Sequence, residues 1–143
     1  MSETPALAPL VQAAYQAADR AITRRLRARG FEVTRAHSAV LANIDIEGGT
    51  RATVLAERAG VTKQAIGQVI DDLQRRGFVT RTEDPDDRRA RLIKLRASGR
   101  RVIASARDVI QAIEARVLED VGPEDVAAAQ RALASLAKHA GQE

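Results

Sequence analysis

Two short helical patterns separated by a glycine turn constrain the fold of this chain more than any other feature. The first pattern covers residues 51–59, with Val54 and Leu55 facing inward and Gly60 just past its end. The second runs over residues 63–76, after the potential cap Thr62, and Gly77 ends it. Helices joined by a turn as tight as residues 59–62 are typical of a helix-turn-helix.

The second of these helices has one apolar and one polar face. Its apolar side chains are spaced at i, i+3, i+4 and i+7, which predicts a face buried in a core; they are Ile66, Val69, Ile70 and Leu73. The opposite face is short and polar and lies towards the helix N-terminus, where a recognition helix contacts bases.

A charged hairpin is predicted after this helix. Residues 78–82 and 91–95 alternate with a period of two, which is typical of strands. Between them, the acidic cluster Asp84, Asp86 and Asp87 surrounds Pro85 and lacks the glycine and distal glutamate of a calcium loop, so turn chemistry explains it better. The hairpin predicts the wing of a winged helix.

Amphipathic helices flank this middle region. Residues 7–29 form the first, Thr34 is the potential cap of a second, residues 98–118 carry a long heptad-like stripe with Ser98 as a candidate cap, and Pro123 begins a last helix. The predicted fold is mainly α with a small β-hairpin wing (α+β), in one domain over residues 1–143. Residues 34–96 form its winged-helix lobe, and the terminal helices 6–29 and 98–139 pack together.

Charge is distributed unevenly along the chain. Residues 50–101 hold 13 basic and 7 acidic residues, a surplus that exceeds the net charge of +4 for the whole chain, and 20 of the 23 basic residues are arginine. Arginine suits phosphate and guanine edges. A basic middle region therefore favours a nucleic-acid partner, although a solvated arginine-rich surface gives the same composition.

Other function classes find little support. The chain has no cysteine, no apolar run long enough to span a membrane, no signal-peptide pattern and no glycine-rich phosphate loop. Its two histidines, His37 and His139, lie too far apart in sequence to suggest a zinc site. We therefore expect a cytoplasmic protein that is not an enzyme, uses no metal or cofactor and does not associate with a membrane.

Two motifs resemble the MarR family of transcriptional regulators. Residues 55–66, LAERAGVTKQAI, are similar to the family's helix-turn-helix, and residues 84–91, DPDDRRAR, to its wing signature with an Asp-x-Arg core at Asp87 and Arg89. The resemblance covers residues 34–136. It implies a repressor that binds double-stranded DNA as a two-fold homodimer, with recognition helices in successive major grooves and wings over the flanking minor grooves.

The dimer implied by the resemblance is built by the first and the last two helices. Apolar residues on these helices are the candidates for its interface: Leu7, Val11, Ile110, Ile113, Val117, Leu133 and Leu136.

Candidate DNA contacts follow from the two motifs. The residues expected to read bases or line the groove are Thr62, Lys63, Gln64, Gly67 and Gln68. In the wing the cations are Arg88, Arg89 and Arg91, of which Arg89 is favoured for a minor groove, and Asp87 is expected to orient an arginine or brace the hairpin. Additional phosphate contacts are expected from Arg51, Arg75, Arg76 and Arg81. For Arg75 and Arg76 an interaction with the helix C-terminus is an equal alternative.

The sequence leaves the effector and the mode of DNA binding open. Family members bind small aromatic or anionic effectors, and Tyr15, Phe31 and His37 could line such a pocket or be core or interface residues. Two other functions compete with a regulator. A nucleoid-type protein would bind DNA without sequence preference, and a winged-helix interaction module would have lost DNA binding.

Overall fold

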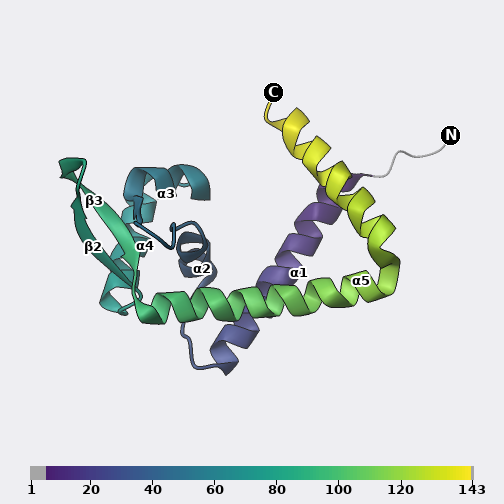
Figure 1. Ribbon diagram of the computed structural model, residues 1–143, viewed down its shortest axis with the longest axis horizontal. Coiled ribbons are helices and arrows are strands. Elements are labelled where there is room, and N and C mark those ends of the chain that lie inside the picture. Colours follow the sequence, from purple (N-terminus) through teal and green to yellow (C-terminus); the bar gives the residue numbers. More distant parts are fainter. Residues whose placement is uncertain (1–5, 143) are drawn as a thin grey trace. The chain divides into compact units, whose positions relative to one another are not determined.

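The computed structural model describes residues 6–142, so the two ends of the predicted domain, residues 1–5 and 143, lie outside the described part. The helices are α1 (Leu7–Ala28), α2 (Arg35–Ala42), α3 (Ala52–Ala59), α4 (Lys63–Arg75) and α5 (Ala97–Ala140). The strands are β1 (Thr50–Arg51), β2 (Val79–Asp84) and β3 (Asp87–Leu95) (Figure 1). The predicted fold class, mainly α with a small hairpin, is confirmed.

The chain divides into two compact units between Arg107 and Asp108. The first holds α1 to α4, the sheet and the beginning of α5; the second holds the rest of α5. In the part of the chain that the structure describes, no helix is both long enough and apolar enough to cross a membrane.

The sheet of the first unit is antiparallel, with the strand order β1-β3-β2. No alternating pattern predicted β1, because two residues are too few to show one. Arg51, expected to begin a helix, instead pairs with Leu92. The hairpin strands are also longer than predicted. They extend until Asp84 lies opposite Asp87, which leaves Pro85 and Asp86 as the tip.

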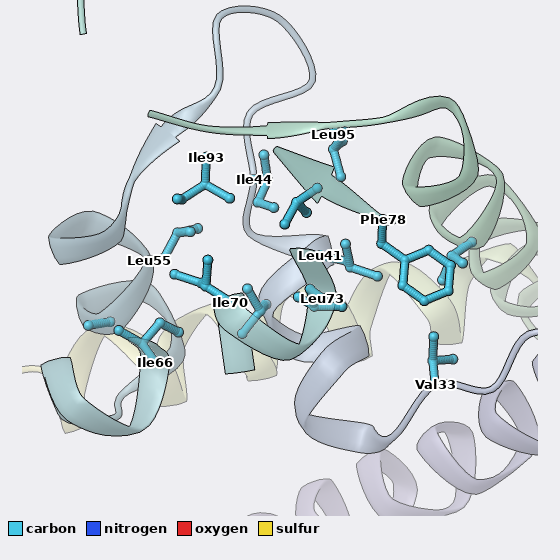
Figure 2. Packing of buried hydrophobic residues seen from close by; sticks show 14 of the residues in the cluster. Val33, Leu41, Ile44, Leu55, Ile66, Ile70, Leu73, Phe78, Ile93 and Leu95 are labelled. Atoms are coloured by element: carbon cyan, nitrogen blue, oxygen red, sulfur yellow. The ribbon is translucent and has the colours of Figure 1, made fainter. Parts of the chain in front are cut away.

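The core of the first unit lies between the short helices and the sheet (Figure 2). Ile66, Ile70 and Leu73 of α4 are at most 2% exposed, as their spacing predicted. They share one cluster with Leu41 of α2 and Leu55 of α3, among others. Burial of this apolar face fixes which side of α4 remains in solvent.

Two of the three predicted N-caps, Thr34 and Thr62, are confirmed. Thr62 Oγ1 accepts a hydrogen bond from the Ala65 amide at 3.1 Å, which caps α4. Thr34 Oγ1 accepts from the His37 amide at 3.2 Å, and His37 Nδ1 accepts from the Thr34 amide at 3.0 Å. These two bonds form a capping box in which histidine takes the place usually held by glutamate or glutamine.

The beginning of α5 corrects one expectation, because Ser98 is not its cap. Ser98 lies inside the helix, and its hydroxyl donates to the Gly77 carbonyl at 2.6 Å. Next to it, a Cβ on Gly99 would lie 2.3 Å from the Phe78 carbonyl oxygen. Glycine at position 99 therefore lets α5 begin directly against the backbone at the start of the hairpin.

In the second unit, α5 consists of two helical segments. Gly122 has φ 83° and ψ 166°, which interrupts the helix, and Pro123 follows. The break before Pro123 was predicted, but the segment ahead of it extends beyond the expected end at Leu118. Here several large apolar side chains stay in solvent: Val117 is 46% exposed and Leu133 45%.

Candidate DNA interface

The N-terminal turns of α4 have an exposed polar face. Lys63, Gln64 and Gln68 are exposed, and within the described residues no hydrogen bond or ion pair engages their side chains. Thr62 is exposed as well, but its hydroxyl already caps the helix. Glutamine can pair with adenine and lysine with guanine or phosphate, so this face has the chemistry to read a major groove.

Gly67 lies in the middle of this face. A Cβ built at this position meets no atom within 4 Å, and the backbone is in an ordinary helical conformation. Close packing against another helix of this unit is therefore not the reason for a glycine here. The other explanation for a glycine here, a close approach of the backbone to DNA, stays a prediction.

The tip of the hairpin carries a second set of free cations. Arg88 and Arg89 are exposed, and their guanidinium groups have no partner in the described part of the chain. Arg91 Nη1 donates to the backbone carbonyl of Arg88 at 3.2 Å. Asp87 Oδ1 accepts from the Arg89 amide at 3.0 Å, so it braces the turn from which Arg89 projects.

Asp84 braces the hairpin from inside, a role that the sequence did not indicate beyond turn formation. Its side chain is 6% exposed; it accepts from Arg51 Nε at 2.6 Å and from the Asp86 amide at 2.9 Å. The Asp86 amide and the Arg51 guanidinium lower the pKa of the Asp84 carboxyl group, against the raising effect of burial. The pair joins β1 to the wing.

Asp72 performs a similar role at the other end of α4. It accepts from Arg76 Nε at 2.9 Å and Arg75 Nη2 at 3.3 Å, and it lies 2.6 Å from Nε2 of the buried His37. Burial raises the pKa of Asp72, but the hydrogen bonds from Arg76 and His37 outweigh it, so the pKa is lowered. The cluster fastens α4 to α2.

The tautomer of His37 follows from its two contacts. Its Nδ1 accepts from a backbone amide, so in the neutral ring Nε2 carries the proton and donates to Asp72. His37 is thus a packing and capping residue on the inner side of the lobe. Nothing in the sequence pattern singled out Asp72 as its partner, because the two lie 35 residues apart.

Arg81 connects the wing strand to the recognition helix. From β2 its guanidinium donates to Asp71 Oδ1 at 2.6 Å and to Gln74 Oε1, both on α4. Of the four predicted phosphate contacts, Arg51, Arg76 and Arg81 thus hold the scaffold together, and Arg75 is 75% exposed beside Asp72. Each pair orders the site, whether or not the arginine also reaches a phosphate.

The three residues considered for an effector pocket have separate environments. Tyr15 is 56% exposed, and the Arg35 guanidinium lies 5.3 Å from its ring centroid. Phe31 packs against the core cluster, and His37 is 4% exposed in the capping box. The described residues contain no group of three or more histidine, aspartate or glutamate side chains that could hold a metal ion.

The residues predicted for a dimer interface are incompletely buried within one chain. Leu7 is 41% exposed, Val11 38% and Ile110 39%, in addition to Val117 and Leu133. Ile113 and Leu136 have intermediate burial. Several exposed apolar side chains on the faces of helices are typical of a surface that another chain covers.

Comparison with known proteins shows a similarity to one family. Residues 31–90 match the model of the MarR family. The transcriptional regulator HosA of Escherichia coli O111:H- is 28% identical over 94 residues, which are 66% of this chain and 70% of HosA.

Solved structures share the fold. Wild-type apo MarR from E. coli superimposes with a TM-score of 0.73 at 23% identity, covering 94% of this chain and 98% of that one. CouR from Rhodococcus jostii RHA1, crystallised with p-coumaroyl-CoA, gives 0.67 at 28% identity over 87% of this chain and 85% of CouR. The matched segment contains the turn, the recognition helix and the hairpin tip described above, so this part of the chain is similar to the winged-helix DNA-binding lobe of MarR-family transcriptional regulators.

Proposed function

We propose that this protein is a cytoplasmic repressor that binds a pseudo-palindromic operator as a homodimer and releases it when a small-molecule effector binds. The observation that carries the proposal is the separation of two kinds of polar side chain. Lys63, Gln64, Gln68, Arg88 and Arg89 are exposed and without partners among the described residues. By contrast, Arg51, Arg76 and Arg81 form ion pairs with carboxylates of the same lobe.

This separation favours sequence-specific binding over non-specific packaging. A packaging protein needs many free cations along its surface, since its affinity comes from phosphate neutralisation. Here most arginines of the lobe serve to order the scaffold, and the free groups include two glutamines suited to base edges. The free side chains lie at the two places, helix N-terminus and hairpin tip, that a winged helix brings to DNA.

The homodimer is supported by the exposed apolar residues of α1 and α5. Two-fold symmetry would present two recognition helices to half-sites one helical turn apart. Effector release is supported by the relative CouR, whose structure was determined with p-coumaroyl-CoA bound.

The test is binding to the intergenic DNA upstream of the protein's own gene, compared with a random duplex of equal length at two salt concentrations. We expect binding about 10³-fold tighter than to the random duplex, and a footprint with half-sites about 10 base pairs apart. Equal and steeply salt-dependent binding to both duplexes would indicate packaging. No binding to either would favour a protein-interaction module.

Single substitutions assign the roles within the interface. Lys63→Ala or Gln64→Ala should weaken operator binding by about 1–3 kcal/mol and leave the fold intact. Arg89→Ala should weaken binding without changing the preferred core sequence. Lys138→Ala removes the same charge as Lys63→Ala from an exposed position in the second unit, and it should leave the preference for the operator unchanged. Equal losses on operator and random DNA for Lys63→Ala would contradict base reading.

A further inference from the structure

The C-terminal half of α1 carries a high density of positive charge. Residues 20–30 contain five arginines and no acidic residue. All five arginines are exposed, at positions 20, 24, 25, 27 and 29. The large apolar side chains of α1 that are exposed all precede this segment; they are Leu7, Leu10, Val11 and Tyr15. The helix therefore has an apolar half, which the proposed dimer would cover, and a cationic half.

Three of these arginines lie along one side of the helix. Arg20, Arg24 and Arg27 are spaced at i, i+4 and i+7, so their side chains share a face, which we call the α1 stripe. Within the described residues no hydrogen bond or ion pair engages these side chains. A favourable interaction with the helix dipole is confined to the last turn, which includes Arg27 but neither Arg20 nor Arg24. Charge compensation at the helix end thus leaves most of the stripe unexplained.

The α1 stripe continues onto the far end of the recognition helix. Arg27 lines the same surface cleft as Arg76, the C-cap residue of α4. Arg76 Nη1 donates to the Glu32 carbonyl at 3.0 Å, just after α1. Leu26 is fully buried in the core, which also fixes the end of α1 against the lobe. Arg75, next to this cap, is 75% exposed. Exposed cations therefore lie at both ends of α4.

The two cationic surfaces are too far apart for one straight duplex to reach both. The 13 residues of α4, at about 1.5 Å each, separate its ends by about 20 Å. The proposed operator contacts lie at the N-terminal end of α4 and at the hairpin tip, whereas the α1 stripe adjoins the C-terminal end. DNA has a persistence length of about 50 nm, so a duplex held at one end of α4 does not bend back to the other.

We propose that the α1 stripe binds the phosphate backbone of a second DNA duplex, so that the protein bridges two DNA segments. Guanidinium groups bind phosphate oxygens through paired N–H donors. Arg20 and Arg27 are about 10 Å apart along the helix axis, and phosphates of one DNA strand follow each other at about 3.4 Å. Three arginines thus match about three successive phosphates. The inference rests on the proposed function in one respect, since the first duplex is the operator.

The composition of this surface favours DNA over a protein or a lipid partner. Protein interfaces have an apolar centre, and helices that lie on membranes have an apolar face. Among residues 16–30, all of which the structure describes, no large apolar side chain is exposed. Binding to a phosphate backbone needs only cations, because its free energy comes from the release of counterions. The stripe therefore fits a DNA contact that does not depend on sequence.

Bridging is measured with the full chain and two duplexes. Operator DNA is immobilised on beads and loaded with protein, free protein is washed away, and a fluorescent duplex of random sequence is added. We expect the beads to capture the fluorescent duplex only when protein is present, and less of it as the salt concentration rises. If the loaded wild-type protein captures no second duplex, the inference is wrong.

A matched pair of double variants assigns the capture to the stripe. Arg24→Gln with Arg27→Gln should lower capture about tenfold and reduce its log–log salt slope by about two units. Operator affinity, measured by fluorescence anisotropy, should not change. Arg131→Gln with Lys138→Gln removes the same charge from exposed positions of the second unit and should alter neither quantity. Circular dichroism shows whether each variant is folded.

Two outcomes with the folded stripe variant would overturn the inference. Unaltered capture would show that the second duplex binds elsewhere. Equal losses of operator affinity and of capture would show that the stripe contacts the operator duplex itself. If the wild type does not prefer operator over random DNA, the proposed function fails, and the loss of capture in the stripe variant still decides the second site.

A competitor distinguishes DNA from other polyanions. Poly-L-glutamate and an unlabelled random duplex are added to the bridged beads at equal concentrations of negative charge. We expect the unlabelled duplex to displace the fluorescent one and the polypeptide to do so much less, because guanidinium groups on one helix face match the regular spacing of phosphates. Equal displacement by both would show that the stripe binds acidic chains in general, and the assignment to DNA would be wrong.

Discussion

Large apolar residues are buried in the winged-helix lobe, whereas several in the C-terminal helix are exposed. In the lobe, Leu41, Leu55 and Leu73 are fully buried, and the exposed face of α4 is polar. In the second unit, Val117, Leu118 and Leu133 have similar side chains and remain 45–47% exposed. The lobe therefore completes its core within one chain, whereas the apolar side chains of the second unit are those that the proposed dimer would cover.

A charge in the helix stripe should give the largest effect. Ile110→Asp places a carboxylate where the proposed dimer buries an apolar face, and an uncompensated buried charge costs about 3–5 kcal/mol. We expect a halved mass in sedimentation equilibrium. Gln111→Asp, at the neighbouring exposed position, serves as the control. An unchanged mass for Ile110→Asp would remove this residue from the interface.

Truncation of a leucine in each region sharpens the comparison. Leu73→Ala should lower the free energy of unfolding by about 2–5 kcal/mol, because it leaves a cavity in a completed core. Leu133→Ala should lower it less, and by an amount that grows with protein concentration, because this side chain is buried only when two chains associate. Urea denaturation at two concentrations measures both; equal, concentration-independent losses would contradict the distinction.

Gly67→Ala examines the polar face of the lobe. Alanine should raise the free energy of unfolding by about 1 kcal/mol, since the added Cβ meets no neighbour and alanine favours helix. If DNA backbone or bases approach Gly67 closely, operator affinity should fall at the same time. A more stable protein with unaltered operator affinity would show that no close approach occurs at this position.

The smallest effect concerns the wing. The pKa of Asp84 is lowered in the folded chain, so its contribution to stability is complete well above the unfolded value of 3.8 and is lost as the pH falls through the folded pKa. Asp84→Asn should remove this part of the acid sensitivity, and Asp86→Asn should not. Thermal unfolding between pH 6 and 3 gives the comparison; identical profiles for wild type and Asp84→Asn would exclude a stabilising Arg51 pair.

Local patterns were sufficient for most of the lobe. The 3.6-residue spacing of Ile66, Ile70 and Leu73 gave the buried face of α4, and hence its exposed face with Lys63 and Gln64. Thr34 and Thr62 gave the helix starts, because a cap needs only the three residues that follow it. The alternating residues gave the hairpin, although they did not give the full length of its strands.

Local patterns could not predict contacts between residues that lie far apart in the sequence. The pairing of β1 with β3, the approach of Gly99 to Phe78, and the pairs of Arg51 with Asp84 and of His37 with Asp72 each join segments that no period or spacing connects. The wrong expectation for Ser98 has the same origin, since its hydroxyl donates to the distant carbonyl of Gly77 rather than capping its own helix.

The sequence by itself determined where the helices and the hairpin lie and which polar side chains face solvent, because propensity, capping and burial patterns act over a few neighbouring residues. Only the tertiary structure decided which cations are free. The sequence alone does not distinguish the arginines that form ion pairs from those that stay free. Folding brings carboxylates to Arg51, Arg76 and Arg81, and among the described residues it brings none to Arg88 and Arg89. Whether a charged group is available for DNA depends on its neighbours in space, and these are set by the packing of the whole lobe.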